Sequence, residues 1–340
     1  MRSAFIVIPD IQFYTGDPAN YHVLEGMMDW ILKNKTRLGI HAVLQLGDLT
    51  NTNTAPEWAL ARRAFAKLDG LLPYFVTLGN HDLGFDYLSS DRFTLLDKHF
   101  QPGQNPLNDK ALVESFEKGS VCNALYQIKI GAETWQVLSL EFGPRNEVVD
   151  WARDVMDQYD QHPTILLTHD FIDHYSTLYT ANGEARRSQV SSPGSPYLFD
   201  IAHQLGGVNC GEDLWTKLVS RCSNIVLTYN GHHKPYEKSP ISGQAKDAYY
   251  LTQSLRRDVR SDGSVCQQVM FNAQWEPFGG NGLMHLVSIN KGIASVEVVS
   301  NLIKPTVKST PATDQELMFD LDLRTVHQPL KVDELNVSQV

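Results

Sequence analysis

The stretch Val76-Thr77-Leu78-Gly79-Asn80-His81-Asp82 decides how the rest of this sequence is interpreted. Its apolar residues predict a buried strand that ends at Gly79, where the missing Cβ lets the backbone turn sharply. Asn80 and His81 can both bind a metal, and they would lie at the carboxyl end of the strand, where open α/β sheets place their sites. The same residues are also ordinary turn chemistry, because Asn and Asp side chains bond to their own backbone.

Composition and charge place the chain among globular proteins. It has 340 residues, of which 42% are hydrophobic and 20% charged, and its formal net charge is -10. This length suits one large or two ordinary domains. The acidic charge disfavours duplex nucleic acid and anionic membranes, although bound divalent cations would still admit an anionic substrate.

Compartment and partners follow from what the sequence lacks. The first ten residues do not have the pattern of a signal peptide, and no stretch approaches the roughly 20 apolar residues of a membrane span. The four cysteines form no C-x-x-C pair. We therefore expect a cytoplasmic protein that does not bind a membrane. The sequence does not predict its oligomeric state.

Short apolar strands alternate with amphipathic helices in the first part of the chain. Strands are predicted over 4–8, 42–46 and 76–78, with helices over 21–36 and 56–69 between them. This order with short loops predicts a parallel, buried sheet. Further along, the sequence predicts an antiparallel hairpin over 124–130 and 134–140, helices over 147–160 and 211–221, and strands over 164–168, 224–228, 265–273, 283–290, 294–300 and 316–324.

Polar donors follow the predicted strands in the same way at five places. They are Asp10 and Gln12, Asp48, Asn80 and His81, His169, and His232. Oxygen and imidazole donors suit Mn, Fe or Zn better than a thiolate site would. Two cations about 3.5–4 Å apart can clamp a phosphoryl group and activate water between them. Such a pair needs a shared carboxylate, and Asp48, on the middle one of the first three strands, is the candidate bridge.

These motifs resemble those of the calcineurin-like metallophosphoesterases, whose pattern is D-x-H, G-D, G-N-H-D/E, a His after a strand, and G-H-x-H. This chain has Asp10-Ile11-Gln12, Gly47-Asp48, Gly79-Asn80-His81-Asp82, Thr168-His169-Asp170 and Gly231-His232-His233-Lys234 in the same order. The first motif is similar to that of a bacterial subgroup with Asp-x-Gln. The resemblance implies an α/β fold, a four-layer αββα sandwich of two mixed β-sheets flanked by helices. We expect this domain over residues 1–304 and a C-terminal extension with one further strand and a tail over 305–340.

The resemblance also implies a role for each motif residue. Asp10 and Gln12 would bind the first of two divalent metal ions, Asp48 would bridge both, and Asn80, His169 and His232 would bind the second. It implies hydrolysis of a phosphate monoester or diester, either a small molecule or a nucleotide, by attack of a metal-bound hydroxide. His81 would assist the leaving group, and Asp82 would hold the His81 ring.

Two departures from the pattern fall on the first metal. Gln12 replaces a histidine, and Lys234 stands where the last histidine would be, although an ammonium has no lone pair for a metal. Three interpretations remain open: a weak or empty first site, His233 as a substitute ligand, or Lys234 as a contact to the substrate phosphate. The alternative function is a catalytically degenerate binding or scaffold protein, which would have no need of costly buried charges.

Other residues are candidates for the substrate. Arg145 follows a predicted strand and could bind phosphate oxygens, or it could pair with Glu147. Asn51 could face the site or cap a helix. Trp275 could line the pocket or belong to the core. Residues 173–200 lack apolar periodicity, which is typical of a lid over a site.

Overall fold

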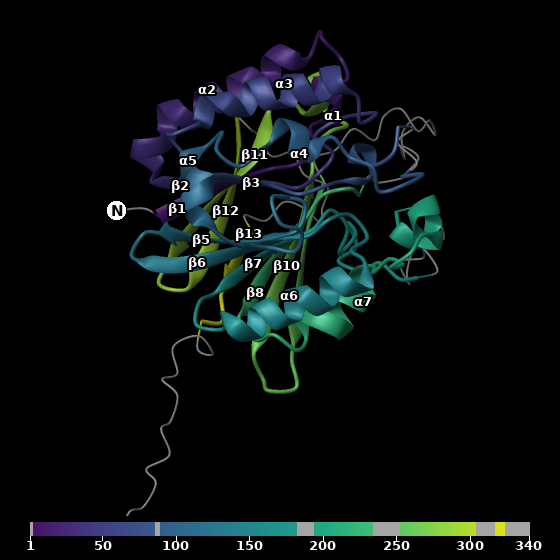
Figure 1. The fold of residues 1–340 in the computed structure, drawn as a ribbon. Coiled ribbons are helices and arrows are strands. Elements are labelled where there is room, and N and C mark those ends of the chain that lie inside the picture. The colour runs from purple at the N-terminus through teal and green to yellow at the C-terminus, as the bar shows by residue number, and fades with distance from the viewer. Residues whose placement is uncertain (1–2, 86–88, 182–193, 234–251, 304–316, 324–340) are drawn as a thin grey trace, which may run out of the picture.

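The computed structural model describes residues 3–85, 89–181, 194–233, 252–303 and 317–323. Two β-sheets are stacked face to face between two layers of helices (Figure 1). This arrangement confirms the predicted four-layer αββα sandwich of two mixed sheets. The predicted boundary between residues 304 and 305 lies outside the described residues, as do Lys234 and residues 182–193 of the expected lid.

The first sheet has the strand order β13-β12-β11-β1-β2-β3, and the second has the order β4-β5-β6-β7-β8-β10-β9. The strands are β1 Ser3–Ile8, β2 Ile40–Gln45, β3 Tyr74–Val76, β4 Leu112–Ser115, β5 Ala124–Ile130, β6 Glu133–Ser139, β7 Thr164–Leu167, β8 Ile225–Asn230, β9 Thr252–Val259, β10 Val265–Asn272, β11 Leu283–Asn290, β12 Ile293–Ser300 and β13 Leu317–Asp320. The α-helices are α1 Gln12–Thr15, α2 Tyr21–Leu38, α3 Ala55–Phe65, α4 Leu96–His99, α5 Pro106–Ala111, α6 Asn146–Gln158, α7 Gly211–Leu214 and α8 Pro277–Gly280.

Parallel pairing brings the ends of the central strands to one edge of the sandwich. β1, β2 and β3 run parallel, as predicted, with Val7 opposite Leu44 and Leu44 opposite Phe75. In the second sheet β6, β7, β8 and β10 are parallel as well. Since the carboxyl ends of parallel strands meet at one edge, the loops after these strands form a common surface.

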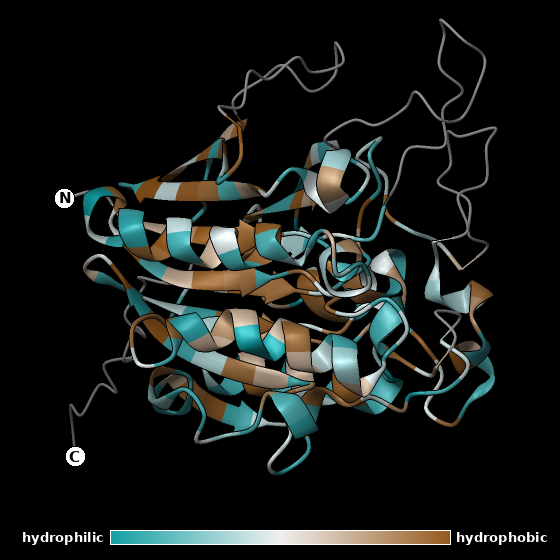
Figure 2. Cartoon of the chain, turned by 90° about the horizontal axis from the view of Figure 1, so that it is seen from above, coloured by the Kyte–Doolittle hydropathy of each residue, from teal (hydrophilic) through white to brown (hydrophobic). Residues whose placement is uncertain are grey.

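Side-chain alternation along the strands divides the core into three layers. In β1, Phe5 and Val7 pack between the two sheets, whereas Ile6 and Ile8 pack against the helices α2 and α3. The outer face of the second sheet packs against α6 in the same way. Successive side chains of a strand point to opposite faces, so a strand buried on both sides is apolar throughout. Figure 2 shows these hydrophobic strands inside and hydrophilic residues on the outward helix faces.

Local sequence sets the ends of the helices that cover the first sheet. Helix α3 begins after Thr54, which forms a capping box with Glu57, and Pro56 occupies the first turn. Helix α2 ends at Gly39, whose φ of 64° is left-handed. The start of α3 fixes the end of the loop that follows β2, and Gly39 leads the chain from α2 directly into β2.

Some elements differ from those expected. Strands β4 and β9 are sheet edges that the sequence analysis did not predict. The predicted helix over 211–221 is instead a short α-helical turn, α7, followed by a π-helical turn over Trp215–Val219. The strand expected over 316–324 is the shorter β13, which pairs with β12 at the edge of the first sheet.

Two global features agree with the composition. Among the described residues, every helix is too short or too polar to cross a membrane. All four cysteines are buried and free.

Candidate metal centre

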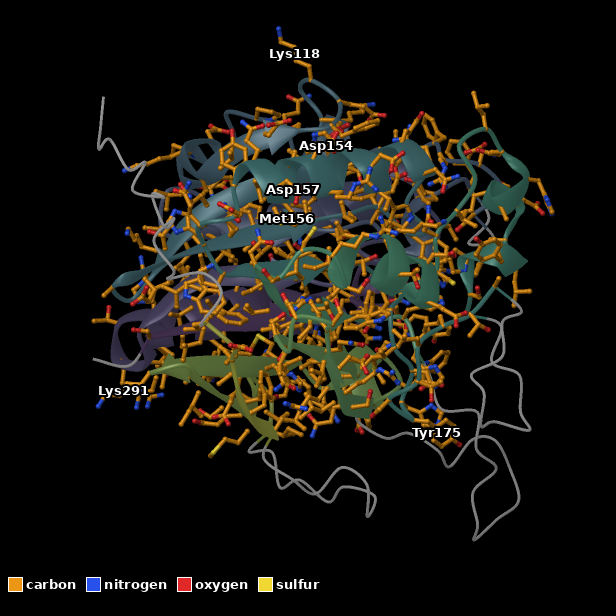
Figure 3. All side chains as sticks on the ribbon, turned by 90° about the horizontal axis from the view of Figure 1, so that it is seen from below. Lys118, Asp154, Met156, Asp157, Tyr175 and Lys291 are labelled. Carbon is orange, nitrogen blue, oxygen red and sulfur yellow. The ribbon has the colours of Figure 1, made fainter. Side chains whose placement is uncertain are left out.

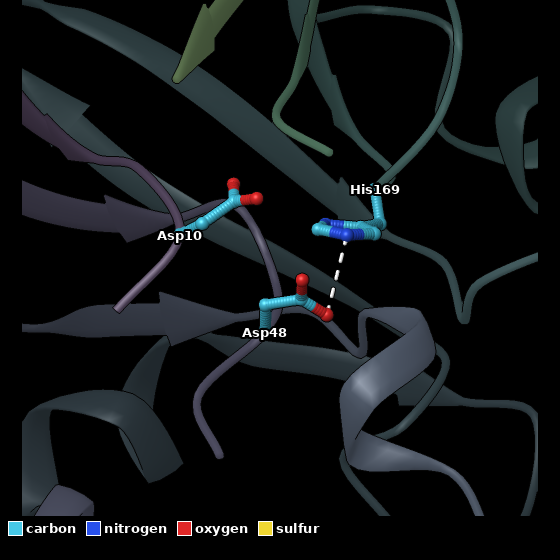
Figure 4. A group of neighbouring side chains, drawn as sticks. All are labelled: Asp10, Asp48 and His169. Atoms are coloured by element: carbon cyan, nitrogen blue, oxygen red, sulfur yellow. Dashed lines mark ion pairs between the residues drawn. The ribbon is translucent and has the colours of Figure 1, made fainter. Parts of the chain in front are cut away.

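Three buried side chains from three strand ends meet at the common edge. Asp10 follows β1, Asp48 follows β2, and His169 follows β7, and none is more than 2% exposed. One donor atom from each lies within 4.8 Å of the other two. Figure 4 shows all three side chains pointing into the same space, with His169 Nε2 3.3 Å from Asp48 Oδ1. This is the geometry of a set of metal ligands.

Two glycines allow the backbone to approach these carboxylates. A Cβ on Gly79 would lie 2.1 Å from Asp48 Oδ1, and a Cβ on Gly231 would lie 2.1 Å from Asp10 Oδ1. Neither distance is compatible with a side chain. The glycine that ends the predicted strand at 76–78 is therefore required for close approach to Asp48.

Asp48 and His232 both have positive backbone φ angles, of 55° and 70°. Non-glycine residues rarely adopt this region, and it is concentrated at functional sites. Both residues thus occupy turns that the surrounding structure holds in place.

The His169 ring is fixed by a backbone carbonyl. Its Nδ1 donates to the carbonyl oxygen of Leu46 at 2.6 Å, so Nε2 faces Asp48. Burial alone would lower the pKa of His169, but Asp48 and Asp10 raise that pKa to about 10. The two buried acidic side chains therefore favour a positive charge beside them.

The pKa values of the two carboxyl groups, Asp10 and Asp48, shift in opposite directions. Burial raises the pKa of Asp10 to about 8, and the charge of Asp48 acts in the same direction. Burial would also raise the pKa of Asp48, but His169 and His81 outweigh it and hold that pKa below its usual range. A divalent cation would relieve this conflict, because it stabilises both carboxylates in the ionised form.

Two amides that the sequence analysis missed surround Asp10. Asn272 Nδ2 donates to Asp10 Oδ2 at 2.9 Å, and Gln274 Nε2 lies 3.4 Å from the same oxygen. Asn272 is the last residue of β10 and Gln274 follows it, so the pattern of polar residues at strand ends would have identified them. Gln12 Nε2 donates to Asp48 Oδ2 at 2.9 Å. The other amide atoms, Gln12 Oε1 and Gln274 Oε1, are buried and accept no hydrogen bond. Such oxygens are suitable donors for a hard cation.

His232 lies against His169 rather than within the cluster of three. The two ring centroids are 4.8 Å apart, and His232 N donates to Asp10 Oδ2 at 3.1 Å. His232 Nε2 is 2.8 Å from the carbonyl oxygen of Gly194, so this nitrogen is the donor of the neutral ring. Burial lowers the pKa of His232 to about 3, and the charge of His169 adds to this effect. His232 is thus neutral, the form that binds metals.

The family model for calcineurin-like phosphoesterases matches residues 3–206 of this sequence. The chain belongs to the calcineurin-like phosphoesterase family. No curated protein sequence matches the chain significantly.

Several solved structures are similar to this chain. One is GAP50, the anchor in the inner membrane complex of Plasmodium, with 9% identity, a TM-score of 0.46, and coverage of 94% of this chain and 89% of that chain. A dimetal phosphatase from Danio rerio has 12% identity, a TM-score of 0.45, and coverage of 88% and 96%. The purple acid phosphatase PPD1 from yellow lupin seeds has 10% identity, a TM-score of 0.49, and coverage of 96% and 55%. These similarities carry no inference about substrate.

The phosphoesterase motif Asn80-His81-Asp82 forms a single 3₁₀ turn after β3. Asn80 is 5% exposed, and its backbone carbonyl accepts from Ser89 Oγ. His81 N donates to Asp48 Oδ1 at 3.0 Å, which places the His81 backbone beside the cluster. His81 Nδ1 is 2.8 Å from the carbonyl oxygen of Asn51. The Asn51 backbone therefore orients this ring, and not Asp82 as the sequence analysis proposed.

Asp82 instead links two loops beside the candidate metal centre. Its Oδ2 accepts from Leu49 N and Gly79 N, and its Oδ1 accepts from Thr50 N and Thr50 Oγ1, at 2.8–3.1 Å. Burial and the charge of Asp48 raise the pKa of Asp82 to about 6. The carboxylate links the loop after β2 to the turn after β3, a positioning role rather than a catalytic one.

The ion pairs of Arg145 favour the alternative to a contact with substrate phosphate. The guanidinium pairs with Glu117, Glu141 and Glu147 at 2.9–3.2 Å, and Glu147 is the acid that the sequence offered as the alternative partner. These carboxylates raise the pKa of Arg145 against the effect of burial. Arg145 thus anchors the start of α6 through three carboxylates.

The His233 ring contacts two side chains that are not part of the three-residue cluster. It stacks on His174 with centroids 4.3 Å apart, and its Nδ1 is 2.9 Å from the hydroxyl oxygen of Tyr179. This arrangement does not support His233 as a substitute ligand for the first metal, as expected for adjacent residues whose side chains diverge.

Proposed function

We propose that this chain hydrolyses phosphate esters with the help of bound divalent metal ions. The observation that carries the proposal is the buried cluster of Asp10, Asp48 and His169, assembled from three strand ends. Two carboxylates at this separation in a dry site are costly without a cation. Family membership supplies the reaction class, and a small-molecule or nucleotide phosphate ester is the proposed substrate.

The donor atoms fit a metal pair of Mn, Fe or Zn. Asp48 lies within reach of both Asp10 and His169. We propose that it would be shared, with Asp10 and Gln12 as ligands of one ion and Asn80, His169 and His232 as ligands of the other. The first ion would have oxygen donors only, so we propose that it is bound more weakly. When bound, the ions would supply positive charge to the phosphoryl oxygens and lower the pKa of water.

The chain's own groups provide the remaining chemistry. Water adds to phosphorus, the ester P–O bond breaks, and the leaving oxygen needs a proton. We assign this proton to His81, whose ring is oriented through Nδ1 by the Asn51 carbonyl, so that Nε2 is the atom that meets the leaving oxygen. The hydrogen bond from His81 N to Asp48 keeps this ring next to the cluster.

The competing proposal is a degenerate, non-catalytic binding protein, motivated by Gln12 in the first motif. That the chain belongs to a bacterial subgroup with an Asp-x-Gln first motif remains a prediction from the sequence. The buried charges of Asp10 and Asp48 favour the catalytic alternative, because a scaffold has no need of them.

Hydrolysis of p-nitrophenyl phosphate and bis(p-nitrophenyl) phosphate with added Mn²⁺ distinguishes the two proposals. We expect turnover of at least one ester, its loss with a chelator, and its loss in Asp48→Asn. The matched control is Asp154→Asn, the same chemical change on the exposed face of α6 (Figure 3), which should retain full turnover. No turnover of either ester by Mn²⁺-loaded protein would favour the scaffold.

A further inference from the structure

A cavity of about 290 Å³ lies next to the candidate metal centre. Its walls come from the loop after β1, the loop after β2 and the loop after β10. The residues that matter for its chemistry are Phe13, Asp17, Asn51, Gln274, Trp275 and Glu276. This volume is large enough to hold part of a substrate.

Two residues of the cavity wall, Gln274 and Asn51, also contact residues of the candidate metal site. Gln274 Nε2 lies 3.4 Å from Asp10 Oδ2, and the Asn51 carbonyl accepts from His81 Nδ1. The cavity therefore opens beside the residue that we assign to the leaving oxygen. A group in this cavity would be the alcohol half of the ester, on the far side of the bond that breaks.

Aromatic rings form one corner of the cavity. Phe13 and Trp275 meet edge to face, with centroids 5.1 Å apart and an interplanar angle of 81°. Both side chains are only half-buried, so ring surface remains at the cavity wall. A cation placed over such rings is attracted by their negative faces.

Carboxylates supply the charge of the cavity. Asp17 is exposed and accepts hydrogen bonds from two neutral donors, Ala19 N and Asn20 Nδ2. Glu276 accepts from the amide of Asn281. Neither a lysine nor an arginine is among the described residues that line this cavity. The described lining therefore disfavours an anionic group and favours a cationic one.

We propose that this cavity binds the alcohol half of the substrate when that half carries an ammonium group, with quaternary ammonium as the best fit. The aromatic corner and the two carboxylates are the elements that recognise such cations in proteins. The inference rests on the proposed function for the identity of the occupant as a leaving group. An ester whose alcohol half carries a further phosphate or carboxylate is disfavoured by the same charges.

The test measures binding to the metal-free protein, so that it does not depend on turnover. Choline is compared by titration calorimetry with 3,3-dimethylbutan-1-ol, which has the same shape and no charge. We expect choline to bind at least tenfold more tightly. In the double variant Asp17→Asn/Glu276→Gln, choline should lose about tenfold in affinity, with little change for the neutral alcohol.

Matched variants separate recognition from folding. Trp275→Leu should weaken choline by about tenfold, with circular dichroism as the check that it folds. Asp154→Asn, which removes one carboxylate from the outer helix α6, should leave choline binding unchanged. Phosphocholine should in turn protect Trp275 from oxidation in the wild-type chain.

The outcomes separate this inference from the proposed function. Equal affinity for choline and the neutral alcohol, or no binding of either, overturns the inference even when p-nitrophenyl phosphate is hydrolysed. Selective choline binding that depends on Asp17 and Glu276 supports the cation site. If the Mn²⁺-loaded protein hydrolyses no ester at all, that site would belong to a binding protein and the leaving-group assignment would be wrong.

Discussion

Replacing Asp82 with asparagine is the sharpest test of how the site is held together. The carboxylate accepts four hydrogen bonds from Leu49, Thr50 and Gly79, all within the buried region between two loops. The side chain of asparagine has one acceptor oxygen in place of two. The donors that bond to the other carboxylate oxygen would then face an NH₂ group, which cannot accept from them. Thr50 Oγ1 can reverse its role and accept, but at least one backbone N–H remains unsatisfied.

The expected cost of Asp82→Asn follows from those contacts. One buried N–H without a partner and the loss of charge-assisted bonds amount to about 3 kcal/mol. For a chain of this length that corresponds to a fall in Tm of roughly 5 °C. The substitution also removes the repulsion between Asp82 and Asp48, which acts in the opposite direction. The stated loss of stability is therefore an upper limit.

The assay is thermal unfolding in excess chelator, so that loss of metal does not contribute. Asp154→Asn, the same chemical change at an exposed position of α6, is the control and should leave Tm unchanged. An unchanged Tm in Asp82→Asn together with a large loss of turnover would refute the positioning role. Asp82 would then act on His81, as the sequence alone suggested.

Three further predictions concern individual side chains. His81→Ala should lower kcat by about 10²–10⁴-fold with metal content intact, and simultaneous loss of metal would show that the assignment is wrong. Arg145→Ala should lower Tm and leave KM unchanged, because the guanidinium pairs with three glutamates; a raised KM at constant Tm would restore it as a phosphate ligand. Because burial and Asp48 raise the pKa of Asp10 to about 8, a metal must displace its proton below that pH. Affinity for Mn²⁺ should therefore increase from pH 6 to pH 8, and calorimetry in buffers of different ionisation enthalpy should detect proton release; a flat profile would contradict the assigned ligand.

The sequence predicted the parts of the fold that depend on apolar runs. The strands after which Asp10, Asp48 and His169 lie are buried on both faces, so their composition is unmistakably apolar. Because the first three run parallel, their ends had to meet at one edge. The meeting of Asp10 and Asp48 was thus predictable from local patterns and one rule of sheet topology, whereas His169 follows β7 of the second sheet, to which this rule does not apply.

The edge strands were missed because their sequences lack such apolar runs. Strand β9, Thr252–Val259, contains Arg256, Arg257 and Asp258 and has no local apolar signal. Its eight residues are held by antiparallel pairing with β10 across the short loop between Val259 and Val265, and not by an apolar pattern of their own. Strand β4 is shorter still and half-buried.

Side-chain partners were the least predictable feature of the site. Asp82 is adjacent to His81 in sequence, yet it bonds to a loop more than thirty residues away, while the Asn51 carbonyl orients the His81 ring. Gln274 reaches Asp10 across 264 positions. Such contacts depend on how two sheets are stacked, which residue spacing does not encode.

The metal content of the purified protein tests the central claim most directly. After incubation with Mn²⁺ and removal of free ions, elemental analysis of the wild-type chain should find at least one tightly held ion, with a second at higher Mn²⁺ concentration. Asp48→Asn, which removes the shared carboxylate, should lose both, and Asp154→Asn should retain them. Absence of bound metal in the wild type, or equal content in Asp48→Asn, would contradict the account.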